Sequence, residues 1–104
     1  MTKVEMNKAL HKAKLAELFT AISNLKDANE ASQFLIDLCT PAELEAMADR
    51  WQVVAEIIAE KPYRKIHEET GVSITTIGRV ARCISYGTGG YQLIFNRLRG
   101  KHAK

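Results

Sequence analysis

The amino-acid sequence predicts an all-helical protein. Apolar residues recur three or four positions apart through most of the 104 residues, which is the spacing of helices that bury one face. The alternation of β-branched and polar residues that marks a strand is absent. Both prolines, Pro41 and Pro62, stand where such apolar stretches begin or end, as prolines at helix boundaries do. We therefore expect about six helices and no sheet.

Two helices are expected before Pro41. The first, at about residues 4–24, carries an apolar face at helical spacing: Leu15, Leu18, Phe19 and Ile22. The second begins after Asp27, whose carboxylate can cap a helix, and Glu30 three residues later completes a capping-box pattern.

Thr40, Pro41 and Glu43 mark the start of a third helix, because a threonine cap, a proline at the first helical position and a glutamate at the third suit a helix start. An apolar stripe follows over about five turns, and we expect one unbroken helix as far as Pro62. The stripe consists of Leu44, Met47, Trp51, Val54 and Ile58. It is either intramolecular core or the contact between two copies. We expect a homodimer, because a small helical chain leaves apolar faces exposed.

A helix-turn-helix unit is predicted at about residues 63–86. Gly71 ends a helix of two turns, and Ser73 can cap the helix that follows. Four apolar residues would pack the two helices together: Ile66, Val72, Ile77 and Val80. A glycine-rich segment then leads to a last helix at about residues 92–99.

Polar residues remain on the outer side of this unit once those apolar residues are buried. Arginine can bond guanine or phosphate, and threonine can bond a base edge or phosphate. The expected DNA-contacting residues are Arg64, Lys65, Ser73, Thr75, Thr76, Arg79 and Arg82. Gly78, in the middle of the second helix, either permits close approach of another backbone, of DNA or protein, or is simply tolerated.

Charge is distributed unevenly along the chain. Residues 27–60 carry one Lys or Arg against eight Asp or Glu, whereas residues 61–104 carry nine against two. A basic block that coincides with a helix-turn-helix favours a nucleic-acid partner, although basic residues on a solvated face would give the same count.

Motifs for catalysis or metal binding are absent from the sequence. His11, His67 and His102 are scattered, neither Cys39 nor Cys83 stands at zinc-ligand spacing, and there is no phosphate-binding loop or nucleophile elbow. We expect no enzyme activity, no metal and no cofactor. Two reduced thiols, no signal peptide and no membrane-length apolar run indicate a cytoplasmic protein, associated with the nucleoid if it binds DNA.

These motifs resemble the Trp repressor superfamily and, within it, the YerC/YecD group of Trp-repressor-related proteins. The resemblance covers about residues 30–99 and is most specific over Gly71–Tyr91. It also rests on Thr40-Pro41-x-Glu43 followed by Arg50. It implies one domain over residues 1–104 whose six helices interlock into an intertwined homodimer, with each subunit presenting a helix-turn-helix to half of a DNA operator.

The resemblance also implies a ligand pocket that this sequence alters. In tryptophan-responsive members, residues matching Thr40, Arg50 and Arg79 contact the ligand, and the next residue is a glycine that leaves room for the indole ring. Here Val80 follows Arg79, and Cys83 replaces a pocket serine. A valine side chain occupies space that the ring needs. We therefore expect these five positions to form a vestigial pocket and no tryptophan corepressor to bind.

The sequence thus predicts a sequence-specific transcriptional regulator, of the repressor kind, that places a helix-turn-helix in the major groove of double-stranded DNA. We expect it to bind DNA without tryptophan. Two alternatives remain. The helix pair could dock another protein as an interaction module, or the chain could sense a small molecule other than tryptophan.

Overall fold

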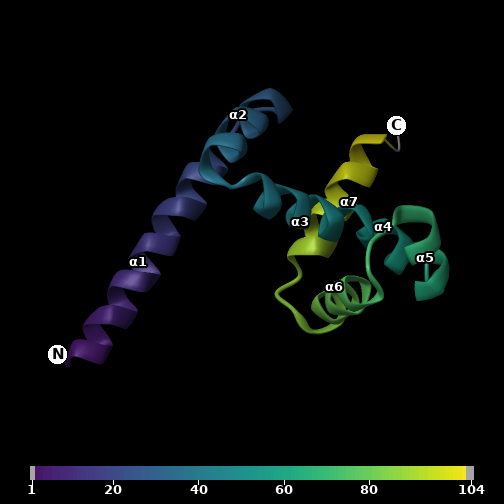
Figure 1. Ribbon diagram of the computed structural model, residues 1–104. Coiled ribbons are helices and arrows are strands. Elements are labelled where there is room, and N and C mark those ends of the chain that lie inside the picture. The colour runs from purple at the N-terminus through teal and green to yellow at the C-terminus, as the bar shows by residue number, and fades with distance from the viewer. Residues whose placement is uncertain (1, 103–104) are drawn as a thin grey trace. The chain divides into compact units, whose positions relative to one another are not determined.

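The computed structural model describes residues 2–102, and the side chains of residues 2–100. Every regular element in that part of the chain is a helix, so the predicted all-α class is confirmed (Figure 1). The chain divides into two compact units, Met1–Thr40 and Pro41–Lys104. Two helices lie in the first unit and five in the second.

The first unit contains α1 (Lys3–Ser23) and α2 (Ala28–Leu38). The Thr2 hydroxyl accepts the Glu5 N–H at 3.1 Å, and the Glu5 carboxylate accepts the Thr2 N–H at 3.4 Å, which is a capping box. Asp27 caps α2 by accepting the Glu30 N–H at 2.8 Å, so the predicted helix start is confirmed. Glu30 reaches back one residue further than in a standard capping box, to the N–H of Lys26 at 3.0 Å.

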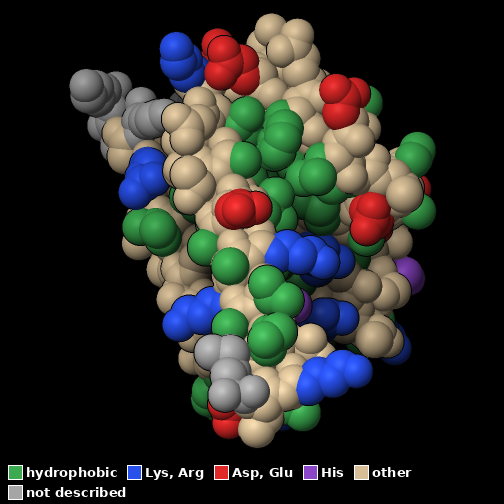
Figure 2. All heavy atoms as spheres, turned by 90° about the vertical axis from the view of Figure 1, so that its left-hand side faces the viewer, with side chains coloured by type: hydrophobic (Ala, Val, Ile, Leu, Met, Phe, Trp, Pro, Cys, Tyr) green, Lys and Arg blue, Asp and Glu red, His purple; other side chains and the backbone are tan. Residues whose placement is uncertain are grey.

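Neither α1 nor α2 buries a side chain within a single copy of the chain. Figure 2 shows one face of the molecule, on which apolar side chains lie at the surface. The large exposed ones on these two helices are Val4, Met6, Leu10, Leu15, Phe19, Ile22, Ile36 and Leu38. Apolar surface of this extent is typical of protein–protein contacts.

The second unit contains α3 (Pro41–Gln52), α4 (Val54–Ile58), α5 (Tyr63–Thr70), α6 (Ile74–Tyr86) and α7 (Gly90–His102). The last helix, α7, extends beyond the predicted range at both ends.

The expectation of one unbroken helix after Pro41 is wrong, because the chain makes a turn at Val53. Val53 keeps right-handed backbone angles, and its carbonyl accepts the Ile57 N–H at 3.0 Å, so the interruption is short. It coincides with two adjacent buried valines, Val53 and Val54, which a regular helix would point in directions about 100° apart. This break explains why residues 2–102 form seven helices rather than about six.

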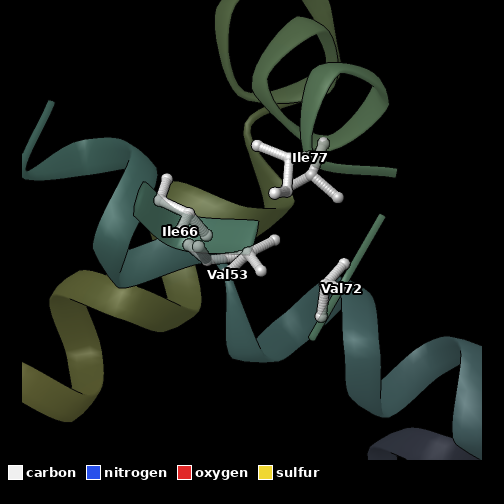
Figure 3. Close-up of a cluster of buried hydrophobic side chains, with 6 residues drawn as sticks. Val53, Ile66, Val72 and Ile77 are labelled. Carbon is white, nitrogen blue, oxygen red and sulfur yellow. The ribbon is translucent and has the colours of Figure 1, made fainter. Parts of the chain in front are cut away.

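The core of the second unit is a cluster of buried aliphatic side chains (Figure 3). Its members are Val53, Val54, Ile66, Val72, Ile77 and Val80, each at most 3% exposed. The cluster therefore includes all four apolar residues that the sequence predicted to join the helix-turn-helix. Burying an aliphatic side chain of this size stabilises a fold by about 1.5–3 kcal/mol, so packing sets the position of α6 against α4 and α5.

A residue with a left-handed backbone, Glu60 (φ 61°), follows the end of α4 and its cap residue Ala59. The Glu60 N–H bonds the Ile57 carbonyl at 2.9 Å, and the Lys61 N–H bonds the Glu56 carbonyl at 3.2 Å. This is the Schellman pattern of a helix C-terminus, in which glycine usually holds the left-handed position. A residue with a side chain is strained there by about 1–2 kcal/mol.

Replacing Glu60 by glycine should therefore stabilise the protein. We expect Glu60→Gly to raise the free energy of unfolding by about 1 kcal/mol in a urea titration, because glycine relieves the left-handed strain but gains chain entropy when unfolded.

Ala59→Gly is the matched control, since Ala59 precedes Glu60 but has an ordinary φ of −75°. It should lower the free energy of unfolding by up to about 1 kcal/mol. Equal destabilisation by both substitutions would contradict the assignment of strain to Glu60.

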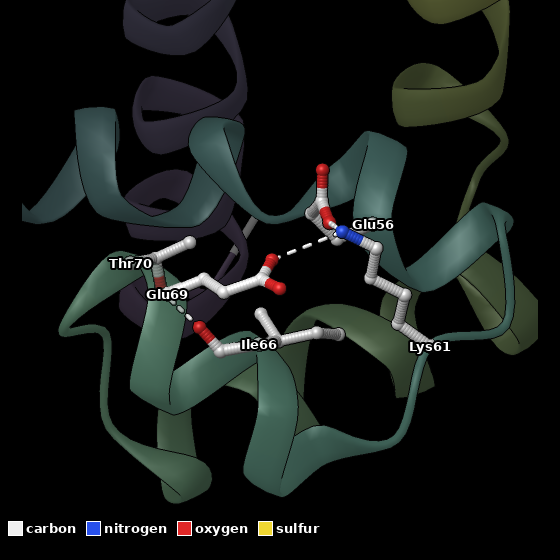
Figure 4. Close-up of polar contacts among 5 residues, drawn as sticks. All are labelled: Glu56, Lys61, Ile66, Glu69 and Thr70. Carbon is white, nitrogen blue, oxygen red and sulfur yellow. Dashed lines mark hydrogen bonds and ion pairs between the residues drawn. The ribbon is translucent and has the colours of Figure 1, made fainter.

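Lys61 joins the end of α4 to α5 (Figure 4). Its ammonium group forms an ion pair with Glu56 and a second with Glu69, the latter at 3.0 Å. Hydrogen bonding to Glu56, and then to Glu69, raises the pKa of Lys61 above its ordinary 10.5. The hydrogen bond from Lys61 lowers the pKa of Glu69 below its ordinary 4.5. All three side chains stay partly exposed, so the pairs contribute modestly to stability and mainly orient α5.

The lowered pKa of Glu69 predicts a pH-dependent contribution to stability. That contribution is present above about pH 4.5 and is lost as the pH falls through the lower pKa of the folded state. Glu69→Gln should therefore unfold at a lower urea concentration than the wild type near pH 7, and the difference should shrink below about pH 4.

Glu68→Gln removes the same charge from the neighbouring position, and Glu68 forms no ion pair with another described residue. It should leave the urea midpoint near pH 7 almost unchanged. A Glu69→Gln deficit that stays constant across the whole pH range would rule out the ion pair as its cause.

Candidate nucleic-acid interface

The turn between α5 and α6 is closed by hydrogen bonds from both sides. Gly71 has a left-handed φ of 77°, and its N–H bonds the His67 carbonyl at 2.8 Å, so the predicted glycine end of α5 is confirmed. The Thr70 hydroxyl donates to the Ile66 carbonyl at 2.7 Å and accepts the Val72 N–H at 3.1 Å. Hydrogen bonds within the turn therefore help the core to fix the orientation of α6 relative to α5.

His67 adds a further bond across this turn. Its Nδ1 lies 2.7 Å from the Val72 carbonyl oxygen. Because a carbonyl oxygen only accepts, Nδ1 must carry the proton and donate it. The imidazole thus ties α5 to the residue that immediately precedes the cap of α6.

Ser73 caps α6, as predicted. Its hydroxyl accepts the Thr76 N–H at 3.1 Å and donates to the Thr76 hydroxyl at 3.0 Å. Both oxygens are thus engaged with each other at the start of the helix. The expected DNA contact of Ser73 stays a prediction.

The outer side of α6 carries three of the predicted contact residues. Thr75, Arg79 and Arg82 are exposed, and helical geometry places them away from the buried Ile77 and Val80. Thr76 differs from expectation, because it is half-buried. Its position lies at the flank of the core face, and its hydroxyl is held by Ser73.

The first turn of α5 carries the other two predicted residues, Arg64 and Lys65, and both are exposed. None of Arg64, Lys65, Arg79 and Arg82 forms an ion pair with another residue of the described chain. The sequence of α6 contains no acidic residue. The surface formed by α6 and the start of α5 is therefore cationic.

The residues of the predicted vestigial pocket are differently placed. Val80 is fully buried in the core cluster, whereas Arg79 and Cys83 are exposed and Arg50 is half-buried on α3. Thr40 is the last residue of the first unit, and the other four belong to the second. Cys83 lies at a hollow of about 470 Å³ whose other walls come from residues 87–91.

Tyr63 and Tyr86 also belong to the cationic surface formed by α6 and the start of α5, and the sequence analysis missed them. Together with Gly78, Ala81, Arg82 and Ser85 they line a hollow of about 420 Å³ between the start of α5 and α6. Tyr86 is 85% exposed. Its distance of four residues from Arg82, one helical turn, was the available signal.

The described side chains, those of residues 2–100, include no group of three or more His, Cys, Asp or Glu that could hold a metal ion. Nor does any helix in that range combine the length and the hydropathy needed to cross a membrane. Cys39 and Cys83 are free thiols.

The capped α6, its buried inner face and its cationic outer face define a helix-turn-helix protein. The model of the Trp repressor protein family matches residues 13–99, and the chain belongs to that family. It is 40% identical over 85 residues to the uncharacterized protein YerC of Bacillus subtilis (strain 168), covering 82% of each chain. The predicted resemblance to the YerC-type group is thus confirmed.

Two solved structures are similar to this chain. A TrpR-like protein from Eubacterium eligens has a TM-score of 0.77 and 40% identity, over 83% of this chain and 89% of that one. A proposed Trp repressor from Staphylococcus aureus has a TM-score of 0.80 and 36% identity, over 95% of this chain and 96% of that one. The predicted Trp-repressor-like fold is confirmed by both.

Proposed function

We propose that this protein is a sequence-specific DNA-binding transcriptional regulator, acting as a repressor, that inserts α6 into the major groove. One observation carries the proposal. Ile77 and Val80 are fully buried on one face of α6, while Arg79 and Arg82 are exposed on the other. Membership of the Trp repressor family supports the same reading.

Each predicted contact residue has a role in this proposal. Arg79 and Arg82 bond guanine or phosphate, and Thr75 bonds a base edge. Arg64 and Lys65 contact phosphates and set the register of the protein on the duplex. Thr76 and Ser73, whose hydroxyls bond each other, approach the DNA at the start of α6.

We further propose that the protein acts as a homodimer in which the two units of each chain form one domain. The exposed apolar faces of α1 and α2 support this. So does Trp51, which remains 39% exposed although its ring stacks on Tyr91 at 6.4 Å. Two helix-turn-helix units in such a dimer would read half-sites about 34 Å apart. We assign the dimer no catalytic activity, metal or cofactor, and place it in the cytoplasm on the nucleoid.

We also propose that the protein binds DNA without tryptophan. Val80 is 0% exposed and packs in the same cluster as Ile66 and Ile77. An apolar side chain at this position holds α6 against α5 permanently, so no ligand is needed to complete the packing. We propose that Val80 occupies the space that the indole ring takes in tryptophan-responsive relatives.

Removing the Val80 side chain should open that space. Val80→Gly should lower the free energy of unfolding by about 3 kcal/mol, from the lost burial and the added mid-helix glycine. Millimolar tryptophan, a concentration high enough to reveal weak binding, should then raise the melting temperature of the variant. It should leave the melting temperature of the wild type unchanged.

Two further variants complete this test. Val80→Ala serves if Val80→Gly fails to fold, and Val72→Ala removes a buried valine of the same cluster at a position outside the predicted pocket. Val72→Ala should lose stability and show no response to tryptophan. Micromolar binding of tryptophan to the wild type in a calorimetric titration would contradict the proposal.

Salt dependence separates DNA binding from docking of a protein. The affinity for duplex DNA should fall steeply as salt rises, because each phosphate contact releases counterions. In fluorescence anisotropy titrations, Arg82→Ala should reduce the slope of log affinity against log salt by about one per subunit.

Arg97→Ala removes an exposed arginine from α7 and should leave that slope unchanged. A wild type with no affinity for any duplex above background would instead favour a protein-interaction module, in which the helix pair α5 and α6 docks another protein. Binding of DNA only in the presence of another small molecule would favour the sensor alternative.

A further inference from the structure

Gly78 lies in the middle of α6, although the packing of this chain does not require a glycine there. Apart from its two chain neighbours and the backbone of the helix itself, a Cβ atom built on Gly78 would meet nothing within 4 Å. The left-handed glycines are Gly71 and Gly89 among the residues described, so Gly78 is not required for a special backbone angle either. A glycine inside a helix nevertheless costs about 1 kcal/mol relative to alanine.

The hollow of about 420 Å³ beside Gly78 is lined by groups that suit a phosphate-bearing strand. Tyr63 comes from the start of α5, and Arg82 and Tyr86 come from α6. Two phenol hydroxyls and a guanidinium group are hydrogen-bond donors, and no acidic residue lines the hollow. Arg64 and Lys65 follow Tyr63 directly, so the cationic surface continues past its edge.

We propose that the sugar–phosphate backbone of one DNA strand lies in this hollow and approaches the backbone of α6 at Gly78. The missing side chain allows that approach, and Tyr63, Arg82 and Tyr86 hold the phosphates around it. Thr75 and Arg79 lie further round α6, away from the hollow, and remain available for the bases. The inference rests on the proposed function and adds to it the point at which the strand is seated.

The small side chains that line the hollow suit the backbone of a DNA strand better than the edge of a base. Gly78, Ala81 and Ser85 have little or no side chain and line the side of α6 that is turned toward Tyr63. Reading a base requires a side chain long enough to reach into the groove, whereas seating a backbone requires close approach with donors at the rim. The residues present supply the second arrangement.

Gly78→Ala tests this inference directly. Because the added Cβ has open space in the free protein, the variant should be as stable as the wild type or more stable. Its affinity for duplex DNA should fall about tenfold or more, and by the same factor on a selected operator and on random duplex, because a backbone contact carries no sequence information.

Gly100→Ala is the matched control, since Gly100 is also helical and a Cβ there also meets open space. It should leave DNA affinity unchanged. Tyr63→Phe and Tyr86→Phe, which remove only the hydroxyls, should each weaken binding about two- to threefold on both kinds of duplex.

The outcomes separate this inference from the proposed function. A wild type that binds no DNA defeats both. A wild type that binds DNA together with a Gly78→Ala variant that binds equally tightly overturns the inference alone. So does a loss confined to the operator, which would assign the hollow to a base, or loss of the dimer in sedimentation, which would assign Gly78 to a protein contact.

Discussion

The packing of Ile77 and Val80 against Ile66 is the interaction on which the rest of the second unit depends. These side chains are fully buried, and they join α6 to α5. Val53 and Val54 in the same cluster join both helices to the start of α4. The direction in which every outer residue of α6 points follows from which residues are buried on its inner face. The exposed arginines and the hollow beside Gly78 are thus consequences of that packing.

The same constraint explains why local devices gather at this turn. Gly71 reverses the chain, Ser73 caps α6, and the imidazole of His67 bonds the Val72 carbonyl. Lys61 adds two ion pairs at the entrance to α5. Each contributes on the order of 1 kcal/mol or less, but together they leave the core little freedom to repack. The side chain of Val80 is itself part of that core.

The helix-turn-helix was predictable because its signals are local. Gly71, Ser73 and four apolar residues specify two helices and their contact faces without reference to the rest of the chain. The turn at Val53 and the left-handed Glu60 were missed, because neither valine nor glutamate is the residue type that signals a helix break or a left-handed position, as glycine and proline do. The half-buried Thr76 and the hollow between Tyr63 and Tyr86 were missed because they depend on how the helices pack in three dimensions. The dimer and the DNA contacts remain predictions.

We propose that α6 is already held in its DNA-binding position without tryptophan. The decisive experiment is a selection of fragments from a whole genome by the purified wild-type protein, performed with and without tryptophan and then sequenced. The same small set of sites should be enriched in both samples. Enrichment that occurs only when tryptophan is present, or no enrichment in either sample, would contradict the proposal.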